Sequence, residues 1–205
     1  GAYTNLGNVY NKIFDYKTAA KMHEKSIELD PKGENAYSNL GTSYKYLGFS
    51  AKSIESYKKA IELDPNFVNA HFDLATMYLT NEDFKNGWKE YEWRFKKDEM
   101  IPHIIKHKDI FSKPLFTGSE DIKGKTLLLH SEQGYGDSIQ FIRFLPQIKE
   151  NFGCKIAVKC REGLKELFQT MKEIDVIVDR SEETPPFDYQ LSIMSMPFVL
   201  DMKSI

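Results

Sequence analysis

The chain has little cysteine and no long apolar run. Its 205 residues include 2 cysteines, Cys154 and Cys160, which are too few for a disulfide framework and are not spaced as a metal site. If residues 155–160 form a strand, the two thiols lie on one face, too far apart to bridge. No apolar stretch approaches the ~18 residues of a transmembrane helix, and no signal peptide is apparent. These absences indicate a cytoplasmic protein with reduced thiols.

Concentrated positive charge is also missing. The chain carries 28 Lys and Arg against 30 Asp and Glu, for a net charge of -2, and neither half is strongly basic. Binding to nucleic acid or to an anionic membrane is therefore not expected. His103 and His107 are four residues apart, but they lack a third ligand, so we expect linker histidines and no metal.

A repeated motif is present in the first half of the chain. The sequences NLGNVY, NLGTSY and DLATMY begin at residues 5, 39 and 73, and ELDP recurs at the same 34-residue interval. This is the period and the Leu-Gly-x2-Tyr pattern of tetratricopeptide repeats, in which two antiparallel helices form each repeat. Small Gly7, Gly41 and Ala75 allow the paired helices to approach closely. We predict repeats at 1–34, 35–68 and 69–97, with helices near 2–13, 16–29, 35–47, 50–63, 69–81 and 84–97.

The pattern changes after the repeats. Residues 98–124 contain scattered prolines, glycines and charges, and are predicted to be a linker. From residue 125, short apolar runs near 125–131, 154–160, 174–179 and 187–194 read as strands, and 138–152 and 162–171 read as helices. Alternation of this kind predicts a parallel sheet. Because a complete doubly wound domain usually has five or six strands, residues 125–205 are predicted to be an incomplete Rossmann-like domain. The fold class is a helical solenoid followed by a partial α/β domain. Since no polar cap precedes the first repeat, we expect the natural protein to continue upstream.

The segment EQGYGDS follows the first predicted strand, where ligands bind in open α/β sheets. Gly134 and Gly136 allow positive φ and close approach of a ligand to the backbone. Ile139 replaces the third glycine of a dinucleotide fingerprint, and no P-loop lysine follows. Asp137 is either a helix N-cap or a general base. Glu132 is a rival carboxylate, or forms a salt bridge or a loop hydrogen bond.

Three ordered motifs suggest a family. The segments GWKEYEWRF, PLFTGSEDIKGKTLLLHSEQGYGDSIQFIRFLPQI and PPFDYQLSIMSMP resemble bacterial tetratricopeptide-repeat glycosyltransferases, whose GT-B unit is similar to heptosyltransferases and to O-GlcNAc transferase. The resemblance implies that the chain holds the repeats and most of the acceptor-side half of a GT-B fold. It makes Asp137 the candidate base. The acceptor cleft would be lined by Gln133, Gly134, Gly136, Gln140 and Arg143.

The resemblance also bears on ligands. The donor-binding half is not visible in the sequence, so we expect no cofactor in this chain and a nucleotide sugar on the missing domain. In such arrays an Asn before the Leu-Gly pair lines the concave face and binds peptide backbone. Asn5 and Asn39 match this position, and Asp73 departs from it. An amide both donates and accepts hydrogen bonds, which suits an extended backbone. The alternative is that these are solvated side chains on an exposed helix face. The alternative function is a non-catalytic interaction scaffold built on the repeats.

Overall fold

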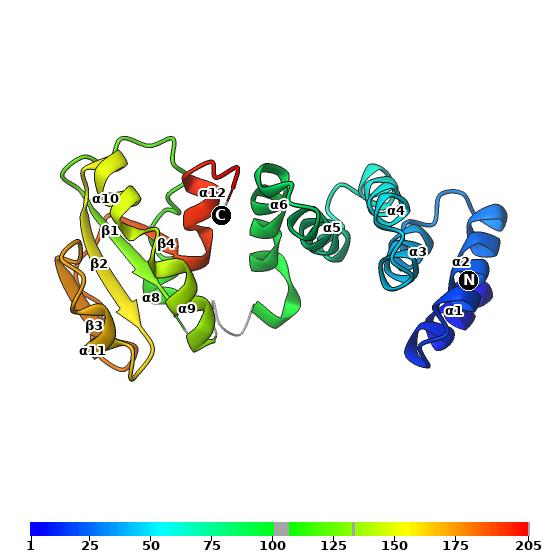
Figure 1. The fold of residues 1–205 in the computed structure, drawn as a ribbon, viewed down its shortest axis with the longest axis horizontal. Helices are drawn as coiled ribbons and strands as arrows, with labels where there is room; N and C mark the ends of the chain where they lie inside the picture. Colours follow the sequence, from blue (N-terminus) through cyan, green and yellow to red (C-terminus); the bar gives the residue numbers. More distant parts are fainter. Residues whose placement is uncertain (101–106, 133, 205) are drawn as a thin grey trace. The chain divides into compact units, whose positions relative to one another are not determined.

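The computed structural model describes residues 1–100, 107–132 and 134–204 (Figure 1). The described chain forms two compact units, which we call the repeat unit (Gly1–Met100) and the sheet unit (residues 107–203). Each has its own set of buried residues.

The repeat unit consists of three helical pairs, which confirms the six helices predicted from the 34-residue period. The last helix is shorter than expected because the chain tightens into a 3₁₀ segment, Glu92–Lys96, followed by another at Asp98–Met100. The helices are α1 (Ala2–Lys12), α2 (Tyr16–Leu29), α3 (Glu34–Tyr46), α4 (Ser50–Leu63), α5 (Val68–Thr80) and α6 (Phe84–Tyr91).

In the first two pairs, a glycine in the first helix leaves room for a ring from the second. Gly41 faces Tyr57, and a Cβ built on Gly41 would come within 2.8 Å of the ring. Gly7 faces His23 in the same way, at 2.4 Å. Tyr57 and His23 are both fully buried. The glycines of the Leu-Gly motif are therefore required by contact with these rings.

The repeated Asp-Pro sequence ends the second helix of the first two pairs. Asp30 and Asp64 are the C-terminal caps of α2 and α4. The Asp30 carboxylate accepts a hydrogen bond from the backbone N–H of Lys32 at 3.2 Å, and Asp64 accepts from that of Asn66 at 2.9 Å. These side-chain turns offer the backbone an alternative to further helix. The motif thus stops one repeat and directs the chain into the next.

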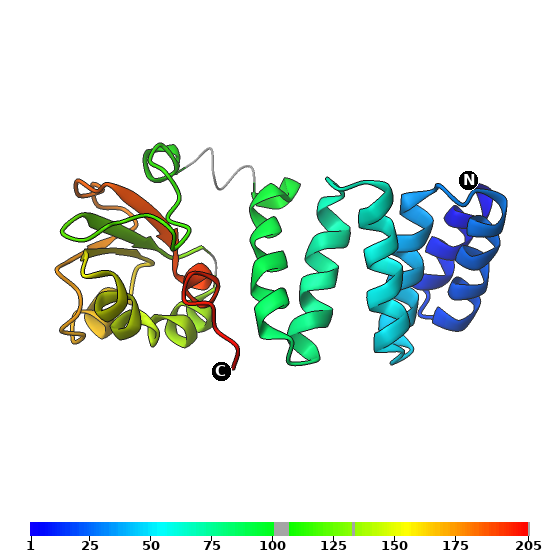
Figure 2. The same ribbon diagram turned by 90° about the horizontal axis from the view of Figure 1, so that it is seen from above.

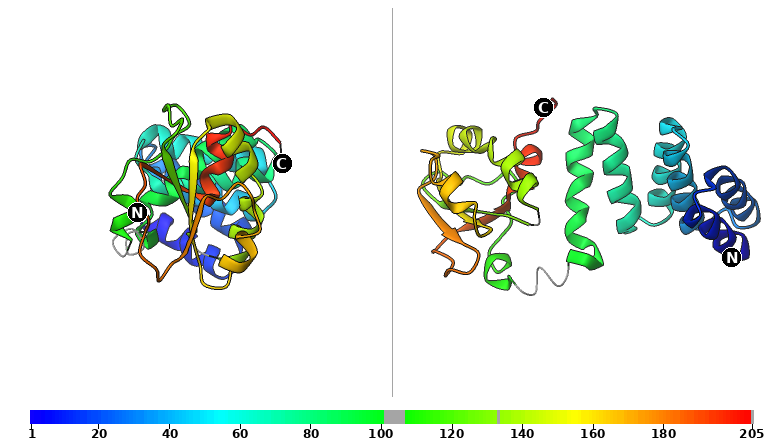
Figure 3. Two further views of the ribbon diagram at one scale, coloured as in Figure 1. Left: turned by 90° about the vertical axis from the view of Figure 1, so that its left-hand side faces the viewer. Right: turned by 60° about the horizontal axis from the view of Figure 1, so that its bottom comes forward.

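The sheet unit contains four parallel strands in the order β3-β2-β1-β4, as expected from the strand–helix alternation. The strands can be followed in the left panel of Figure 3. Leu127, Leu128 and Leu129 of the central strand are fully buried, because the sheet is covered on both faces. The strands are β1 (Thr126–His130), β2 (Lys155–Cys160), β3 (Val176–Asp179) and β4 (Tyr189–Ser192).

Short helices cover the sheet. Helices α9 (Tyr135–Ile142), α10 (Leu145–Phe152) and α11 (Lys165–Phe168) lie on one face, and α8 (Lys108–Phe111) lies on the other (Figure 2). On the α8 face, Ile110 packs against Leu128 and Ala157. After β4, the chain forms a 3₁₀ turn, Ile193–Ser195, and helix α12 (Met196–Val199).

Two predicted helices differ from the structure. The expected helix at 138–152 is divided into α9 and α10, with Pro146 in the first turn of α10. Proline has no backbone N–H and cannot sit in a helix interior without breaking it, but it fits a first turn. The expected helix at 162–171 is reduced to the four residues of α11, and Gly163, with φ of +84°, precedes it.

Residues 107–124 were predicted to be part of a linker. In the structure they belong to the sheet unit. Phe116 and Ile122 are buried. The backbone N–H of Phe116 donates to the carbonyl of Gln190 at 2.9 Å, and that of Gln190 donates to the carbonyl of Pro114 at 3.0 Å. The segment therefore runs beside β4 as a short parallel extension. Its irregular, proline-containing sequence concealed these two apolar anchors.

Candidate functional site

The three residues predicted to bind peptide occupy equivalent positions on α1, α3 and α5. Asn5 is exposed, and Asn39 and Asp73 are partly buried. Helix α3 contacts both α1 and α5, so the first helices of the three repeats form one continuous face. We call this the inner face. The side-chain amides of Asn5 and Asn39 have no hydrogen-bond partner among the described residues, and they therefore remain available to a ligand.

Asp73 is close enough to two lysines, which sequence reasoning missed, for their charges to act on its carboxyl. Burial raises the pKa of its carboxyl, and the charges of Lys45 and Lys97 oppose that shift. Lys97 also lies over the ring of Phe72, with Nζ 4.4 Å from the ring centroid. The inner face thus changes from neutral amides on the first two repeats to a charged Lys-Asp-Lys cluster on the third. Only the fold could bring Lys97 back to α5, because it follows the last helical pair.

Polar bonds connect the first helix of one repeat to that of the next. Asn11 accepts a hydrogen bond from the Ser43 hydroxyl at 3.0 Å. One repeat later, Lys45 Nζ donates to Thr76 Oγ1 at 3.2 Å. Asn11 and Lys45 occupy the same repeat position. These bonds hold adjacent first helices in register, and so they hold the spacing of the inner face.

A hollow in the repeat unit lies along α4. Its volume is about 1120 Å³, and it is lined by lysines and glutamates of α4 together with Tyr44 and Tyr78. Lys52 lies over the Tyr44 ring, and Lys58 lies over the Tyr78 ring, at 5.3 and 5.6 Å from the centroids. None of the predicted peptide-binding residues lines this groove. The groove is lined by both lysines and glutamates, so its charge does not favour a cationic ligand over an anionic one.

In the sheet unit, the loop after β1 leads into α9 as expected. Gly134 has φ of +52° and is the N-cap residue of α9. A Cβ there would come within 2.7 Å of Asp137 Oδ2, so glycine is needed for both conformation and space. Gly136 has no such role. Gly136 is helical and exposed, and a Cβ there would meet nothing within 4 Å. Its φ is not positive, so the structure does not require glycine at this position.

Asp137 is not the N-cap of α9. That position belongs to Gly134, and no side chain makes a cap bond there. Asp137 lies in the first turn, where a carboxylate interacts favourably with the positive end of the helix dipole. It is partly exposed. Its carboxylate has no hydrogen bond or ion pair among the described residues, so it is available to a ligand.

Glu132 is held in the interior. It is 5% exposed, and its carboxylate accepts a short hydrogen bond from the Ser192 hydroxyl at the end of β4. Arg180 Nη2 donates to the backbone carbonyls of Ser131 and Glu132, at 2.7 Å each. Of the two alternatives to a catalytic role considered for Glu132, the structure supports the hydrogen bond. The bond joins the ends of β1 and β4.

The remaining predicted cleft residues lie on or near α9. Gln140 and Arg143 are exposed. The Arg143 guanidinium carbon lies 4.7 Å from the centroid of the Phe144 ring. Gln133 lies outside the described residues. The structure thus places Asp137, Gln140 and Arg143 along one short helix, and separates them from buried Glu132.

Sequence reasoning missed a hollow at the carboxyl ends of β2 and β3. It has a volume of about 380 Å³, and we call it the arginine pocket. Arg161 directly follows β2 and Arg180 directly follows β3, and Cys160 and Asp179 are register partners. The two arginines therefore leave the sheet side by side. The pocket is lined by His107, Tyr135, Arg161, Glu162, Asp179, Arg180 and Ser181.

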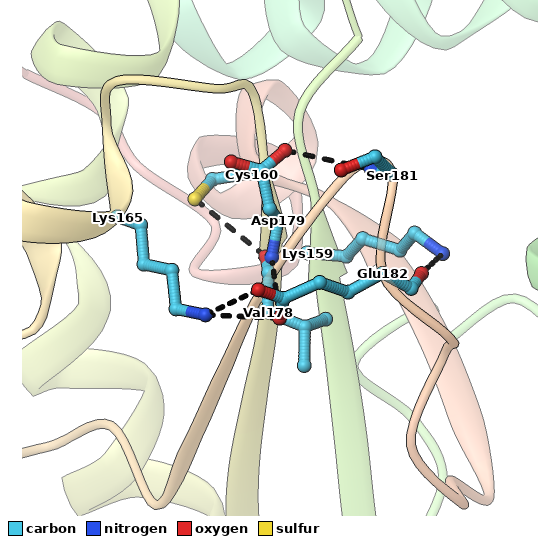
Figure 4. A network of polar contacts seen from close by, with 7 residues as sticks. All are labelled: Lys159, Cys160, Lys165, Val178, Asp179, Ser181 and Glu182. Atoms are coloured by element: carbon cyan, nitrogen blue, oxygen red, sulfur yellow. Dashed lines mark hydrogen bonds and ion pairs between the residues drawn. The ribbon is translucent and has the colours of Figure 1, made fainter.

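A polar network holds the loop that carries Arg180 (Figure 4). Lys165 Nζ donates to both carboxylate oxygens of Glu182, at 2.6 and 2.9 Å. Glu182 also accepts from the backbone N–H of Asp179, while Lys159 Nζ donates to the Glu182 carbonyl at 3.0 Å. The bond from Lys165 is the main cause that lowers the pKa of Glu182. The loop is consequently tied to β2 and α11.

Neither thiol is part of a site. Cys154 and Cys160 are both buried and unpaired, and burial raises the pKa of the Cys160 thiol to about 11. Within residues 1–100, 107–132 and 134–204, no group of three His, Cys, Asp or Glu side chains is arranged to hold a metal ion. His103, of the predicted pair with His107, lies outside the described residues.

In the part of the chain that the structure describes, every helix is too short or too polar to cross a lipid bilayer.

Comparison with known proteins addresses the repeat unit. Residues 1–32 match a family model described as tetratricopeptide repeat, and residues 50–81 match one described as TPR repeat. These segments are tetratricopeptide repeats. Neither model extends into the sheet unit. No curated protein matches the chain.

Solved structures with similar tetratricopeptide repeats include the first TPR of Spaghetti (RPAP3) bound to an HSP90 peptide. It has 18% identity and a TM-score of 0.46, over 55% of this chain and 92% of that chain. The TPR2B-domain:pHsp70-complex of yeast Sti1 has 25% identity and a TM-score of 0.44, over 52% and 85%. MamA has 27% identity and a TM-score of 0.45, over 52% of this chain and 60% of that chain.

Proposed function

We propose that the tetratricopeptide repeats bind an extended peptide segment of a partner protein on the inner face. The observation that carries the proposal is the recurrence of Asn5 and Asn39 at one helix position on adjoining first helices. An extended backbone presents donors and acceptors at regular intervals, and an amide side chain can pair with both. The charged cluster at Asp73, Lys45 and Lys97 would select polar or charged residues at one end of the bound segment.

Removing both amides tests this proposal. We expect Asn5→Ala with Asn39→Ala to weaken binding of a peptide, selected against the wild-type chain from a random library, by at least about tenfold, or 1.4 kcal/mol. Isothermal titration calorimetry would measure the affinity. The matched control is Asn66→Ala with Asn86→Ala, which removes two exposed amides that do not lie on the first helices. Equal losses in both double variants, or unchanged affinity in the first, would contradict the proposal.

We further propose that the sheet unit is the acceptor-side half of a Rossmann-like glycosyltransferase of the GT-B type. Two observations support it. The order β3-β2-β1-β4 is that of the first strands of a doubly wound sheet. Asp137 offers an uncommitted carboxylate after β1, where ligands bind in such sheets, while the rival Glu132 is buried and bonded to Ser192. Asp137 is thus the better candidate to accept the proton of an attacking sugar or protein hydroxyl.

Sugar transfer also requires a domain that binds the nucleotide sugar, which is not among these 205 residues. In a protein that carries both halves, we expect Asp137→Asn to lower the rate of transfer by roughly a hundredfold or more, the contribution of a general base. Thermal unfolding should change little, because the Asp137 carboxylate makes no hydrogen bond or ion pair among the described residues, and Asn loses only its interaction with the helix dipole, about 1 kcal/mol or less. Gln147→Ala, at an exposed position of α10, is the control and should retain most activity. Full activity of Asp137→Asn would remove it from the mechanism.

A further inference from the structure

The arginine pocket contains two guanidinium groups that the protein does not neutralise directly. Within the described residues, neither Arg161 nor Arg180 has a carboxylate within 4.0 Å. The pKa of Arg180 is lowered mainly by burial and also by the charge of Arg161, so the two charges are close enough to affect each other. Bringing two cations together at the edge of a sheet costs free energy unless an anion lies between them.

Both guanidinium groups are held before any ligand arrives. Arg180 Nη2 donates to the carbonyls of Ser131 and Glu132, which leaves its remaining N–H groups free of protein acceptors in the described chain. The guanidinium carbon of Arg161 lies 4.7 Å from the centroid of the Tyr135 ring. The network around Glu182 fixes the loop between β3 and β4 (Figure 4). Such preorganisation lowers the entropy cost of binding.

The pocket also contains two acidic residues. Asp179 Oδ1 already accepts from the backbone N–H of Ser181, at 3.4 Å, and Glu162 is exposed to solvent. Both are more than 4.0 Å from the guanidinium nitrogens, so they reduce the local positive potential without occupying the arginine donors. The Ser181 hydroxyl makes no hydrogen bond to a described residue and can add a third donor.

We infer that the arginine pocket binds a phosphate group, with Arg161 and Arg180 donating to its oxygens and Ser181 completing the contacts. Arginine has a planar fork of N–H donors that matches phosphate geometry, and two such forks suit a dianion better than a monovalent carboxylate. The carboxyl ends of parallel strands are the usual ligand side of such a sheet. The inference goes beyond the proposed function, because it needs neither peptide binding nor sugar transfer.

Titration of the ¹⁵N-labelled chain with inorganic phosphate, followed by NMR at constant ionic strength, tests the inference. We expect saturable shifts of the Tyr135 and Ser181 amides. Arg161→Gln should weaken binding by at least about tenfold. Lys155→Gln is the control, because it removes the same charge from the opposite end of the same strand and should bind as the wild type does. Glucose 6-phosphate and pyrophosphate, titrated in parallel, would distinguish a sugar phosphate from a nucleotide-like diphosphate as the ligand.

Arg161→Lys separates geometry from charge. It retains the positive charge but loses the fork, so its affinity should fall between those of the wild type and Arg161→Gln. Shifts that do not saturate would overturn the inference, as would equal weakening by Arg161→Gln and Lys155→Gln. Circular dichroism of each variant, with an unchanged spectrum, would show that lost binding does not reflect a lost fold.

Discussion

Replacement of Gly41 by alanine should lower the free energy of unfolding of the repeat unit by about 2 kcal/mol, although alanine is the better helix former by about 1 kcal/mol. The added Cβ would lie 2.8 Å from two carbons of the Tyr57 ring. The ring has no room to retreat, since Tyr57 is fully buried and its hydroxyl is 3.1 Å from Thr42 Oγ1. The clash therefore outweighs the gain in helix propensity.

Urea denaturation followed by tryptophan fluorescence measures this effect, because both tryptophans of the chain, Trp88 and Trp93, lie in the repeat unit. Tyr57→Leu alone, and combined with Gly41→Ala, completes a double-mutant cycle. We expect the double variant to be more stable than the sum of the two single losses predicts, because a smaller side chain accommodates the methyl group. A raised midpoint for Gly41→Ala, or strict additivity, would show that the Gly41–Tyr57 contact does not limit packing.

Acidification should destabilise the repeat unit through His23. The ring is fully buried, and burial lowers its pKa from 6.5 to about 4. The unfolded chain therefore takes up a proton near pH 6.5, while the folded chain resists protonation until about pH 4. Stability is retained above pH 6.5 and is lost as the pH falls toward 4, by up to about 3 kcal/mol.

His23→Tyr isolates this contribution. It reproduces in the first repeat the residue that Tyr57 provides in the second, with Gly7 in the place of Gly41. We expect the unfolding midpoint of the variant to change much less than that of the wild type between pH 7 and pH 4.5. Since the other titrating groups are common to both proteins, the difference between the two curves reports His23. Parallel curves would mean that the pKa of His23 is the same in the folded and the unfolded chain, and would contradict the prediction.

The repeats were readable from sequence because several positions recur together at one interval, including the Leu-Gly pair, the Tyr and the Asp-Pro turn. Each is a local requirement, such as a close helix contact or a chain reversal. The parallel sheet was predicted for a similar reason, from short buried runs alternating with amphipathic ones. Pro146 also indicates locally that a helix begins there, at the break between α9 and α10. The apolar spacing around it, however, predicted one continuous helix.

The arginine pocket could not be predicted in this way. Arg161 and Arg180 are far apart in sequence, and each is an ordinary charged residue after a strand. They meet only because β2 pairs with β3 in the register that places Cys160 beside Asp179. Similarly, Glu132 and Ser192 are joined only once β4 lies beside β1. Local patterns indicate which residues reach the ligand edge of the sheet, and strand order decides which of them become neighbours.

The glycine-and-ring pairs of the repeat unit have a consequence for how such arrays can change. Gly7 and His23 lie within the first repeat, and Gly41 and Tyr57 lie within the second. Each of these two repeats therefore contains both partners of its glycine–ring contact. A whole repeat can be duplicated, deleted or moved without creating a mismatch there. In contrast, the hydrogen bond between Asn11 and Ser43 and the one between Lys45 and Thr76 each join two different repeats. Compatibility of a transplanted repeat is therefore decided at contacts that cross between repeats, which include these bonds and the apolar packing of Tyr57 against Leu74 and Met77.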